Sequence, residues 1–406
     1  MKYKTTTLDT FVTLQRGFDL PAQDRISGDI PVIAANGPVG FHNVAKVNYQ
    51  CVVLGRSGSV GNPQLIAKPF WPLNTTLFVK DFHGNSPTFV YYVLKTIDFK
   101  SFDAGGTVPT LNRNHLTQIE VPLLDLARQE SIGAVLQNLD SKIATNKALS
   151  KTLEDIAQTI FKSWFIDFDP VKSKMKGERP VGMDDATAAI FPDSMEESEL
   201  GLIPKKWKVE TIRYLCDSVV NGSTPLRTNT SFWSPHDISW FKTGELSDNF
   251  LFDSKESISQ LALDNTSVKV LPRGSVLMAI YAAPTVGRLG ILTKSASFNQ
   301  ACTGMVVKSE FGTPYLYLTL FNRRTWFNSL AIGAAQQNIS KLIVESCPAI
   351  IASQEVHNAF LEVIQPIFAQ IEALSSQSIS LALIRDSLLP RLISGELQIP
   401  EEMLAS

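Results

Sequence analysis

Few residues of this 406-residue chain have types and spacings that could do chemistry. Asp167 and Asp169 could hold a metal ion between two carboxylates, but the polar side of an extended segment leaving a helix is the favoured interpretation. Gly55, Gly58 and Gly61 follow a strand-like run with the spacing G-x-x-G-x-x-G, which favours a tight turn over a phosphate-binding loop. The sequence contains no G-x-x-x-x-G-K-[ST] loop and no Asn-Pro-Pro-aromatic tetrapeptide. It therefore favours neither an autonomous NTPase nor an amino-methyltransferase.

The cysteines and histidines do not form a pattern that binds metal. The four cysteines contain no C-x-x-C pair, which argues against a zinc site and against a disulfide framework. The histidines are equally scattered: His42, His83, His115, His236 and His357. Nothing assembles a nucleophile, a base and an orienting group. We therefore expect a recognition scaffold without catalysis, metal or cofactor, in a reducing, cytoplasmic compartment.

Length and composition are those of an ordinary soluble protein of two to four domains. Hydrophobic residues make up 44% and charged residues 19% of the chain. No run of 18 apolar residues and no apolar segment after Lys2 and Lys4 occurs, so we expect neither a membrane span nor a secretory signal. The net charge is −2, but residues 1–124 carry +3 and residues 209–350 carry +2. Such small positive balances are compatible with phosphate contacts and equally with an uncharged ligand.

Two helical stretches repeat each other at an offset of 228 residues. Their mostly apolar residues step by four and three, as in the seam of a coiled coil. The first seam is Ile132, Leu136, Leu139, Ile143, Asn146, Ser150, Leu153, Ala157, Ile160 and Trp164. The second seam is Phe360, Ile364, Ile367, Ile371, Leu374, Ser378, Leu381, Arg385, Leu388 and Leu392.

Each helix would be roughly 50–60 Å long at ~1.5 Å per residue, which is more than one small domain needs. The alternative is one amphipathic helix per domain, packed on its own core. The shared offset favours two helices that pack against each other. Pro366 interrupts the second seam and predicts either a bend or a later start of that helix.

The segments before the two helices also repeat, although less clearly. Val60-Gly61 corresponds to Val286-Gly287, and Asn74 corresponds to Asn299. Short β-branched runs between Gly, Pro and Asn turns predict a mixed α/β domain of short strands in each half. The expected organisation is a domain at 1–124, a long helix at 125–165, a polar connector without its own core at 166–208, a domain at 209–350, a long helix at 351–395 and a tail at 396–406.

Several segments carry a family resemblance. Residues 161–170 read Phe-Lys-Ser-Trp-Phe-Ile-Asp-Phe-Asp-Pro, and further distinctive segments are Gly182–Asp184, Phe191–Asp193, Ser198–Gly201, Ile203–Trp207 and Arg385–Leu397. Together with the duplicated layout, they resemble the specificity subunit of type I restriction-modification systems. The resemblance covers essentially the whole chain. Its motifs are specific in the connector and in the last helix, and weak in the two domains.

The resemblance implies an α+β fold. Two mixed α/β target-recognition domains would stand in pseudo-two-fold arrangement, separated by two long helices packed as an antiparallel coiled coil. Each domain would read one half of an asymmetric bipartite target in double-stranded DNA, and the helices would set the unread spacer. The chain would lack catalysis. Methylation would belong to two modification subunits that use S-adenosylmethionine, and translocation with cleavage would belong to restriction subunits.

Base readout needs polar or basic side chains on loops or strand ends that enter a groove. The candidates in the first domain are Arg25, Asn36, Arg56, Ser57, Asn62 and Arg113. Those in the second domain are Arg227, Lys242, Tyr281, Thr285, Arg288, Gln336 and Gln337. For any one of them, a solvated loop residue or a turn hydrogen bond is the competing interpretation. Arg56 and Arg288 are favoured because each is near a shared Val-Gly pair.

Two other functions remain open at this point. A fused restriction or methylation enzyme would need motifs that the sequence lacks. A coiled-coil adaptor that binds only protein would show no sequence-selective retention of DNA, even with every partner subunit present.

Overall fold

The structure is a computed structural model that describes residues 3–102, 109–281, 285–330 and 338–400. It divides into two compact units. Unit 1 comprises Met1–Thr145 with Gln377–Ser406, and unit 2 comprises Asn146–Ser376. Each unit holds one mixed α/β domain and a part of both long helices, so the predicted α+β class with two mixed domains and long helices is confirmed.

The domain of unit 1 is built from short strands. A four-stranded sheet has the order β2-β8-β5-β6, a three-stranded sheet has the order β4-β3-β7, and β1 pairs with β9. Its elements are β1 (Lys4–Thr7), α1 (Leu8–Phe11), β2 (Thr13–Arg16), η1 (Ala22–Asp24), β3 (Ile30–Ala34), β4 (Gly37–His42), β5 (Cys51–Gly55), β6 (Gly61–Ile66), β7 (Trp71–Pro72), β8 (Thr76–Asp81), α2 (Pro87–Lys95), η2 (Phe99–Phe102), η3 (Arg113–His115) and β9 (Glu120–Leu123).

The domain of unit 2 repeats this plan with additions. Its sheets have the orders β13-β20-β17-β18-β15 and β16-β14-β19, and β12 pairs with β21. Its elements are β12 (Lys208–Thr211), α6 (Ile212–Leu215), β13 (Cys216–Asn221), η4 (Thr230–Phe232), β14 (Ile238–Phe241), η5 (Thr243–Glu245), β15 (Asn249–Leu251), β16 (Glu256–Ile258), α7 (Gln260–Asn265), β17 (Val276–Ala279), β18 (Leu289–Leu292), β19 (Ser297–Phe298), β20 (Cys302–Val307), α8 (Gly312–Asn322), α9 (Arg324–Leu330), α10 (Lys341–Ser346) and β21 (Pro348–Ile351).

The two domains correspond strand by strand. In each small sheet the central strand pairs antiparallel with one neighbour and parallel with the other, as β3 does with β4 and β7, and β14 with β16 and β19. Gly17 and Gly222 follow the matched strands β2 and β13. A Cβ on Gly17 would lie 2.1 Å from the Leu73 carbonyl oxygen, and one on Gly222 would lie 2.1 Å from that of Asn299. Only glycine fits at these two positions, where the backbone passes close to a carbonyl oxygen of another segment.

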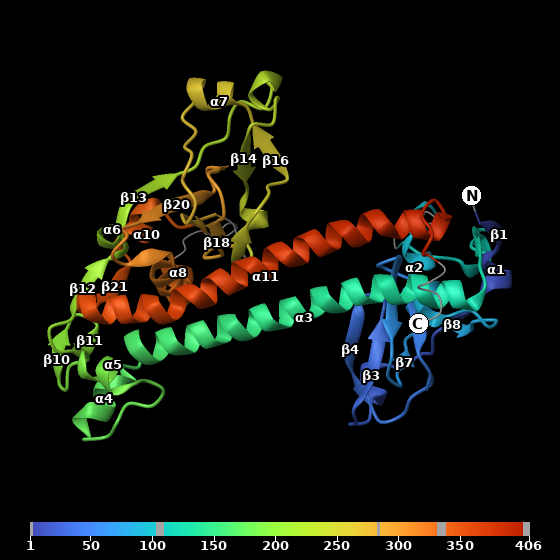
Figure 1. Cartoon of the computed structure of the whole chain (residues 1–406), viewed down its shortest axis with the longest axis horizontal. Helices are drawn as coiled ribbons and strands as arrows, with labels where there is room; N and C mark the ends of the chain where they lie inside the picture. Colours follow the sequence, from blue (N-terminus) through green and yellow to red (C-terminus); the bar gives the residue numbers. More distant parts are fainter. Residues whose placement is uncertain (1–2, 103–108, 282–284, 331–337, 401–406) are drawn as a thin grey trace. The chain divides into compact units, whose positions relative to one another are not determined.

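The long helices are α3 (Leu126–Phe165) and α11 (Gln354–Ser394) (Figure 1). Side chains cap their first turns, since Asp125 accepts from the Arg128 amide at 2.9 Å and Ser353 accepts from the Val356 amide at 3.4 Å. Gly395, with a φ of +76°, follows the end of α11. Pro366 lies inside α11, so the second helix does not start late.

The helices run antiparallel within each unit. In unit 2, Phe161 lies 6.0 Å from Phe360 and Phe165 lies 5.7 Å from His357, measured between ring centroids, so rising numbers on α3 meet falling numbers on α11. In unit 1, Arg385 of α11 forms an ion pair with Asp140 of α3. Every member of the two predicted seams is buried or half-buried.

Residues 166–208, the predicted polar connector, place several aromatic side chains in the core of unit 2. They form α4 (Asp169–Met175), α5 (Asp185–Ala189), β10 (Met195–Ser198) and β11 (Gly201–Pro204). Phe168, Phe191 and Trp207 are buried in the same cluster as Trp164 of α3. Flanking prolines and charges concealed these aromatic anchors from an argument based on composition.

The interpretation of Asp167 and Asp169 needs correction. Asp169 begins α4 directly after Phe168, whose φ is +56°, so the chain turns sharply here rather than leaving the helix extended. Asp167 forms an ion pair with Lys162 of α3. The two carboxylates thus have separate structural surroundings.

α11 is also the one helix in the described part of the chain that is long and apolar enough to cross a membrane by length and composition. Its mean hydropathy reaches 1.3 over an 18-residue window, although no unbroken apolar run of that length exists. The buried residues of α11, including Phe360, Ile364 and Leu392, belong to the cores of the two units.

Candidate nucleic-acid interface

Arg56 and Arg288 lie in matched hairpins. Arg56 follows β5 in the β5–β6 connection, whereas Arg288 precedes β18 in the β17–β18 connection. Gly61, the first residue of β6, and Gly287, two residues before β18, have φ values of +79° and +82°, a conformation that favours glycine. The glycines of the shared Val-Gly pairs therefore have the same backbone conformation. The two arginines lie on opposite sides of the matched hairpin, Arg56 after its first strand and Arg288 before its second strand.

Arg56 belongs to a polar chain that sequence reasoning found only in part. Its guanidinium donates to the Asn74 carbonyl oxygen at 3.4 Å. The Asn74 amide donates to the Asp19 carboxylate, and Arg16 lies 3.5 Å from that carboxylate. Ser57 is held beside Arg56 because its amide donates to Thr75 at 3.2 Å. Arg16 and Asp19 were not predicted, since they belong to no shared motif.

The other candidates of the first domain are dispersed. Arg25 donates to the Val39 carbonyl oxygen of β4 at 2.9 Å, and Asn36 is exposed in the turn between β3 and β4. Asn62 is exposed near the start of β6, with a φ of +51°. Arg113 lies in η3, at a pocket that it lines together with Leu8 of α1. These residues do not form one contact network with Arg56.

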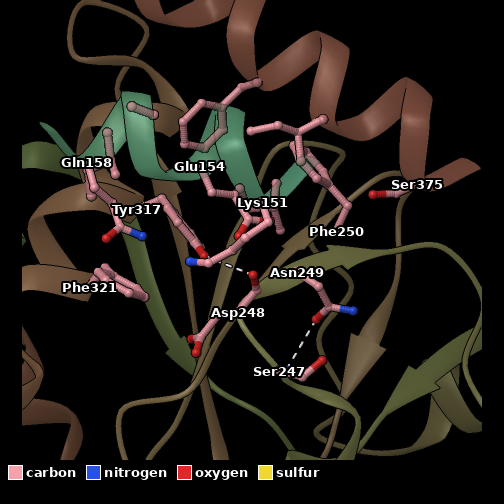
Figure 2. Close-up of a pocket in the computed structure, with 15 residues that line it drawn as sticks. Lys151, Glu154, Gln158, Ser247, Asp248, Asn249, Phe250, Tyr317, Phe321 and Ser375 are labelled. Carbon is pink, nitrogen blue, oxygen red and sulfur yellow. Dashed lines mark hydrogen bonds between the residues drawn. The ribbon is translucent and has the colours of Figure 1, made fainter. Parts of the chain in front are cut away.

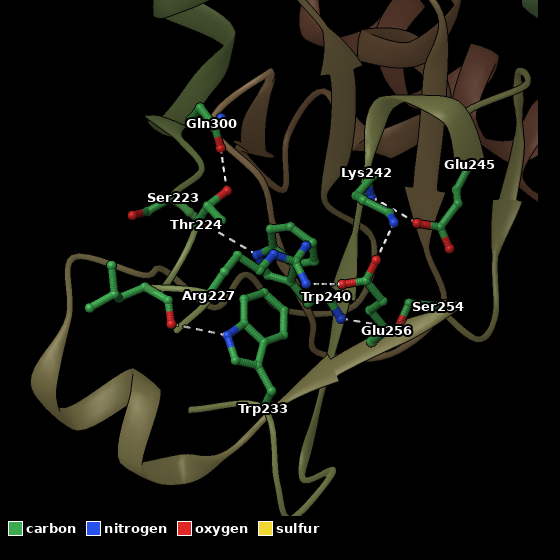
Figure 3. Close-up of polar contacts among 11 residues, drawn as sticks. Ser223, Thr224, Arg227, Trp233, Trp240, Lys242, Glu245, Ser254, Glu256 and Gln300 are labelled. Atoms are coloured by element: carbon green, nitrogen blue, oxygen red, sulfur yellow. Dashed lines mark hydrogen bonds and ion pairs between the residues drawn. The ribbon is translucent and has the colours of Figure 1, made fainter. Parts of the chain in front are cut away.

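Arg227 and Lys242 meet at one carboxylate, that of Glu256, in the second domain (Figure 3). Neither cation is fully exposed, and Glu256 is the more buried partner, with 29% of its side chain exposed. The Arg227 guanidinium carbon lies 3.7 Å from the ring centroid of Trp233 and 5.0 Å from that of Trp240. The hydrogen bond from Lys242 and that from Arg227 lower the pKa of Glu256, although desolvation opposes them.

Tyr281, Thr285 and Arg288 lie in one loop at the end of β17. The Thr285 hydroxyl donates to the Tyr281 carbonyl oxygen at 2.8 Å, and the Arg288 amide donates to the Thr285 carbonyl oxygen at 2.9 Å. Arg324 of α9 fixes the neighbouring turn, because its Nε donates to the Gly287 carbonyl oxygen at 2.9 Å and its guanidinium pairs with Asp248. Gln336 and Gln337 lie outside the described residues.

Unit 2 also has a cavity of about 340 Å³ beside α3 (Figure 2). Glu154 of α3 is half-buried in its wall, and desolvation raises the pKa of that carboxyl. Tyr317 donates to the Asp248 carbonyl oxygen at 3.0 Å, and burial raises the pKa of its phenol. Among the residues that line this cavity, none pairs a nucleophile with a base within hydrogen-bonding distance.

Comparisons with known proteins agree with this geometry. The model of the type I restriction modification DNA specificity domain matches the chain twice, over residues 2–155 and 204–379. The type I restriction enzyme HindI specificity subunit of Haemophilus influenzae is 26% identical over 334 residues, which cover 72% of each chain. The MjaIX specificity subunit of Methanocaldococcus jannaschii is 24% identical over 320 residues, which cover 77% of this chain and 69% of the relative.

The fold has a solved counterpart as well. The crystal structure of the S subunit of the type I restriction-modification system from M. genitalium aligns with a TM-score of 0.61 at 13% identity, covering 97% of this chain and 96% of that one. That likeness concerns the fold alone. The two matches of the family model coincide with the two domains and their following helices. The chain therefore belongs to the type I restriction-modification DNA specificity family.

Proposed function

We propose that this chain recognises a bipartite DNA sequence, with each domain reading one half-site. The observation that carries the proposal is the duplication of one domain plan, strand by strand, with different polar residues on the matched loops. Arg56 and Arg288 illustrate the difference, because they occupy opposite arms of the same hairpin. Two related readers with different loops bind two different half-sites, so the target is asymmetric.

The long helices fix the unread spacer in this proposal. Both α3 and α11 continue without interruption from residues of one unit to residues of the other. A continuous helix transmits distance better than a flexible linker, because its rise of ~1.5 Å per residue is set by backbone hydrogen bonds. Half-sites about one turn of DNA apart, ~34 Å, are the natural partners of a duplicated reader.

The chain acts as a scaffold without catalysis of its own. The described residues show no nucleophile–base pair in the cavity beside α3, and the sequence has no methyltransferase tetrapeptide. Two modification subunits supply adenine methylation with S-adenosylmethionine, and restriction subunits supply translocation and cleavage. We place the assembly in the cytoplasm, where the DNA is.

The function is tested by mapping methylated adenines in DNA modified by the chain together with its modification subunits. We expect two different short half-sites separated by a spacer of constant length. The isolated chain, free of partner subunits, is the control and should turn over no S-adenosylmethionine. Methylation without sequence preference, or turnover by the chain alone, would contradict the proposal.

A further inference from the structure

A tryptophan marks the same place in both domains. The indole N–H of Trp71 donates to the carbonyl oxygen of Phe18 at 3.4 Å, and that of Trp240 donates to the carbonyl oxygen of Ser223 at 3.0 Å. Phe18 and Ser223 each follow the matched glycine at the end of the first sheet strand. The two tryptophans come from different strands of the small sheet, β7 and β14. Each nevertheless donates its indole N–H to the residue that directly follows the matched glycine, Gly17 or Gly222.

Each of these rings carries a cation. Lys46, in the loop between β4 and β5, places its ammonium 4.9 Å from the ring centroid of Trp71. Arg227, in the loop between β13 and η4, places its guanidinium carbon 5.0 Å from the ring centroid of Trp240. An aromatic face stabilises a cation without neutralising it, so the charge stays available to an anion. Two unrelated loops thus bring a cation to the matched place.

The two cations differ in their counter-charges. Lys46 is exposed, and in the described part of the chain its ammonium contacts the rings of Phe18 and Trp71. Arg227 pairs with Glu256, and the same carboxylate also binds Lys242 (Figure 3). Two further hydrogen bonds hold the backbone beside this ion-pair network. Glu245 accepts from the Lys242 amide at 2.9 Å, and Ser254 accepts from the Trp240 amide at 3.0 Å. At the matched tryptophan, the first domain therefore presents Lys46 without a carboxylate partner among the described residues, whereas the second presents Arg227 already paired with Glu256.

We infer that Glu256 is a specificity-determining residue that keeps Arg227 and Lys242 from binding the phosphates of non-target DNA. The inference rests on the proposed function. Phosphate contacts are independent of sequence, so every cation that is withheld from them lowers non-target affinity. A lone phosphate must displace Glu256 from a network that already satisfies both cations. A base edge with two acceptors in fork geometry compensates an arginine for that loss far better.

The test compares non-target binding by Glu256→Gln and wild-type chains, each assembled with its modification subunits. Glutamine keeps the shape and an acceptor but loses the charge. Each added phosphate contact makes the slope of log K against log salt steeper by about 0.9. Over the tenfold change from ~1 M to ~0.1 M salt, this corresponds to about an eightfold gain in affinity. We expect a slope change of one to two contacts on a duplex without the target, and a smaller change on the target.

Asp264→Asn provides the matched control. Asp264 is exposed in α7 of the same domain and accepts from Gln260 at 2.9 Å, so its removal deletes one negative charge without releasing a cation. It should leave the salt slope unchanged. An equal gain in both variants, or a Glu256→Gln gain that persists when Arg227 and Lys242 are also replaced by alanine, would overturn the inference.

Two further variants test the same point without altering Glu256. Lys46→Ala should lower non-target affinity by about eightfold at ~0.1 M salt, because that cation is free. Arg227→Ala should change it by less than about twofold, because that cation is already paired. Equal losses would contradict the inference. A wild-type complex that does not prefer its target at all would instead contradict the proposed function, so the two failures are distinguishable.

Discussion

His357 is a buried imidazole in the core of unit 2, with 1% of its surface exposed. Its ring lies 4.6 Å from Tyr315 and 5.2 Å from Phe311 between centroids, and its Nε2 accepts from the Ala352 amide at 3.2 Å. Burial lowers the pKa of His357 to about 4, because the charged form loses its hydration among aromatic rings. The histidine is therefore neutral at physiological pH.

This burial predicts loss of stability in mild acid. The unfolded chain binds a proton near its ordinary pKa of about 6.5, whereas the folded chain resists protonation until about pH 4. Stability is therefore fully present above ~6.5 and falls as the pH drops toward 4, by up to about 3 kcal/mol. We expect the midpoint of thermal unfolding to fall between pH 7 and 5, and to fall less in His357→Phe.

His236 supplies the control for that experiment. It is exposed in the loop before β14, so His236→Ala should keep the pH dependence of the wild type. If His357→Phe and wild type lost the same number of degrees between pH 7 and 5, the slope would come from other groups.

The matched hairpin arginines carry a prediction about single half-sites. Replacing Arg56 or Arg288 by alanine should cost about 1–3 kcal/mol of target affinity if the side chain makes a bidentate base contact. Methylation maps should then show relaxed specificity in one half-site only, a different one for each variant.

The control for these variants is Lys68→Ala, which removes an exposed cation after β6 of the first domain. It should weaken binding to all sequences alike without relaxing either half-site. Relaxation of both half-sites by Arg56→Ala would mean that this residue shapes the complex rather than reads a base.

At the scale of elements, the seams were predictable, but the partner of their charged member Arg385 was not. Every residue that the 3-4 spacing selected is buried or half-buried, because burial of one stripe imposes that period, although further buried residues such as Phe165 and His357 flank the stripe. The spacing gave no reason for Arg385, which pairs with Asp140 while Tyr92 of α2 donates to the same carboxylate at 2.7 Å. Burial raises the pKa of Asp140, but these hydrogen bonds outweigh it and leave the pKa below its ordinary value.

The site was harder to predict than the fold, for a physical reason. Arg227 and Lys242 could be named as polar loop residues, yet their counter-charge Glu256 is on another strand and no period links the three. The matched glycines were also missed. Gly17 and Gly222 are 205 residues apart, whereas the helical seams repeat at 228, because the second domain has additional elements such as β15.

An insertion in one helix tests whether α3 sets the spacer. Four residues added after Leu153 shift the seam by about one turn, roughly 6 Å along the axis. At ~3.4 Å of rise per base pair, the preferred spacer should change by one or two base pairs with both half-sites kept. The measurement is a methylation map of DNA modified by the variant complex. An active variant with an unchanged spacer would mean that the modification subunits set the distance.

At the scale of the whole molecule, the duplicated plan makes the two readers separable. Each domain has its own sheets, and each is followed by a long helix that shares the core of its unit. The strand pair β12–β21 closes the second domain near both of its ends, through Lys208–Thr211 and Pro348–Ile351. Residues 209–350 can therefore be exchanged as one folded domain, because both ends of this segment lie in the same strand pair.

That exchange is the most direct test of the account. Residues 209–350 are replaced by the corresponding domain of a relative with a different target, and DNA modified by the complete complex is mapped for methylated adenines. We predict that one half-site changes to that of the relative, while the other half-site and the spacer stay as they were. A change in both half-sites, or in neither, would contradict the claim that each domain reads its own half of the target.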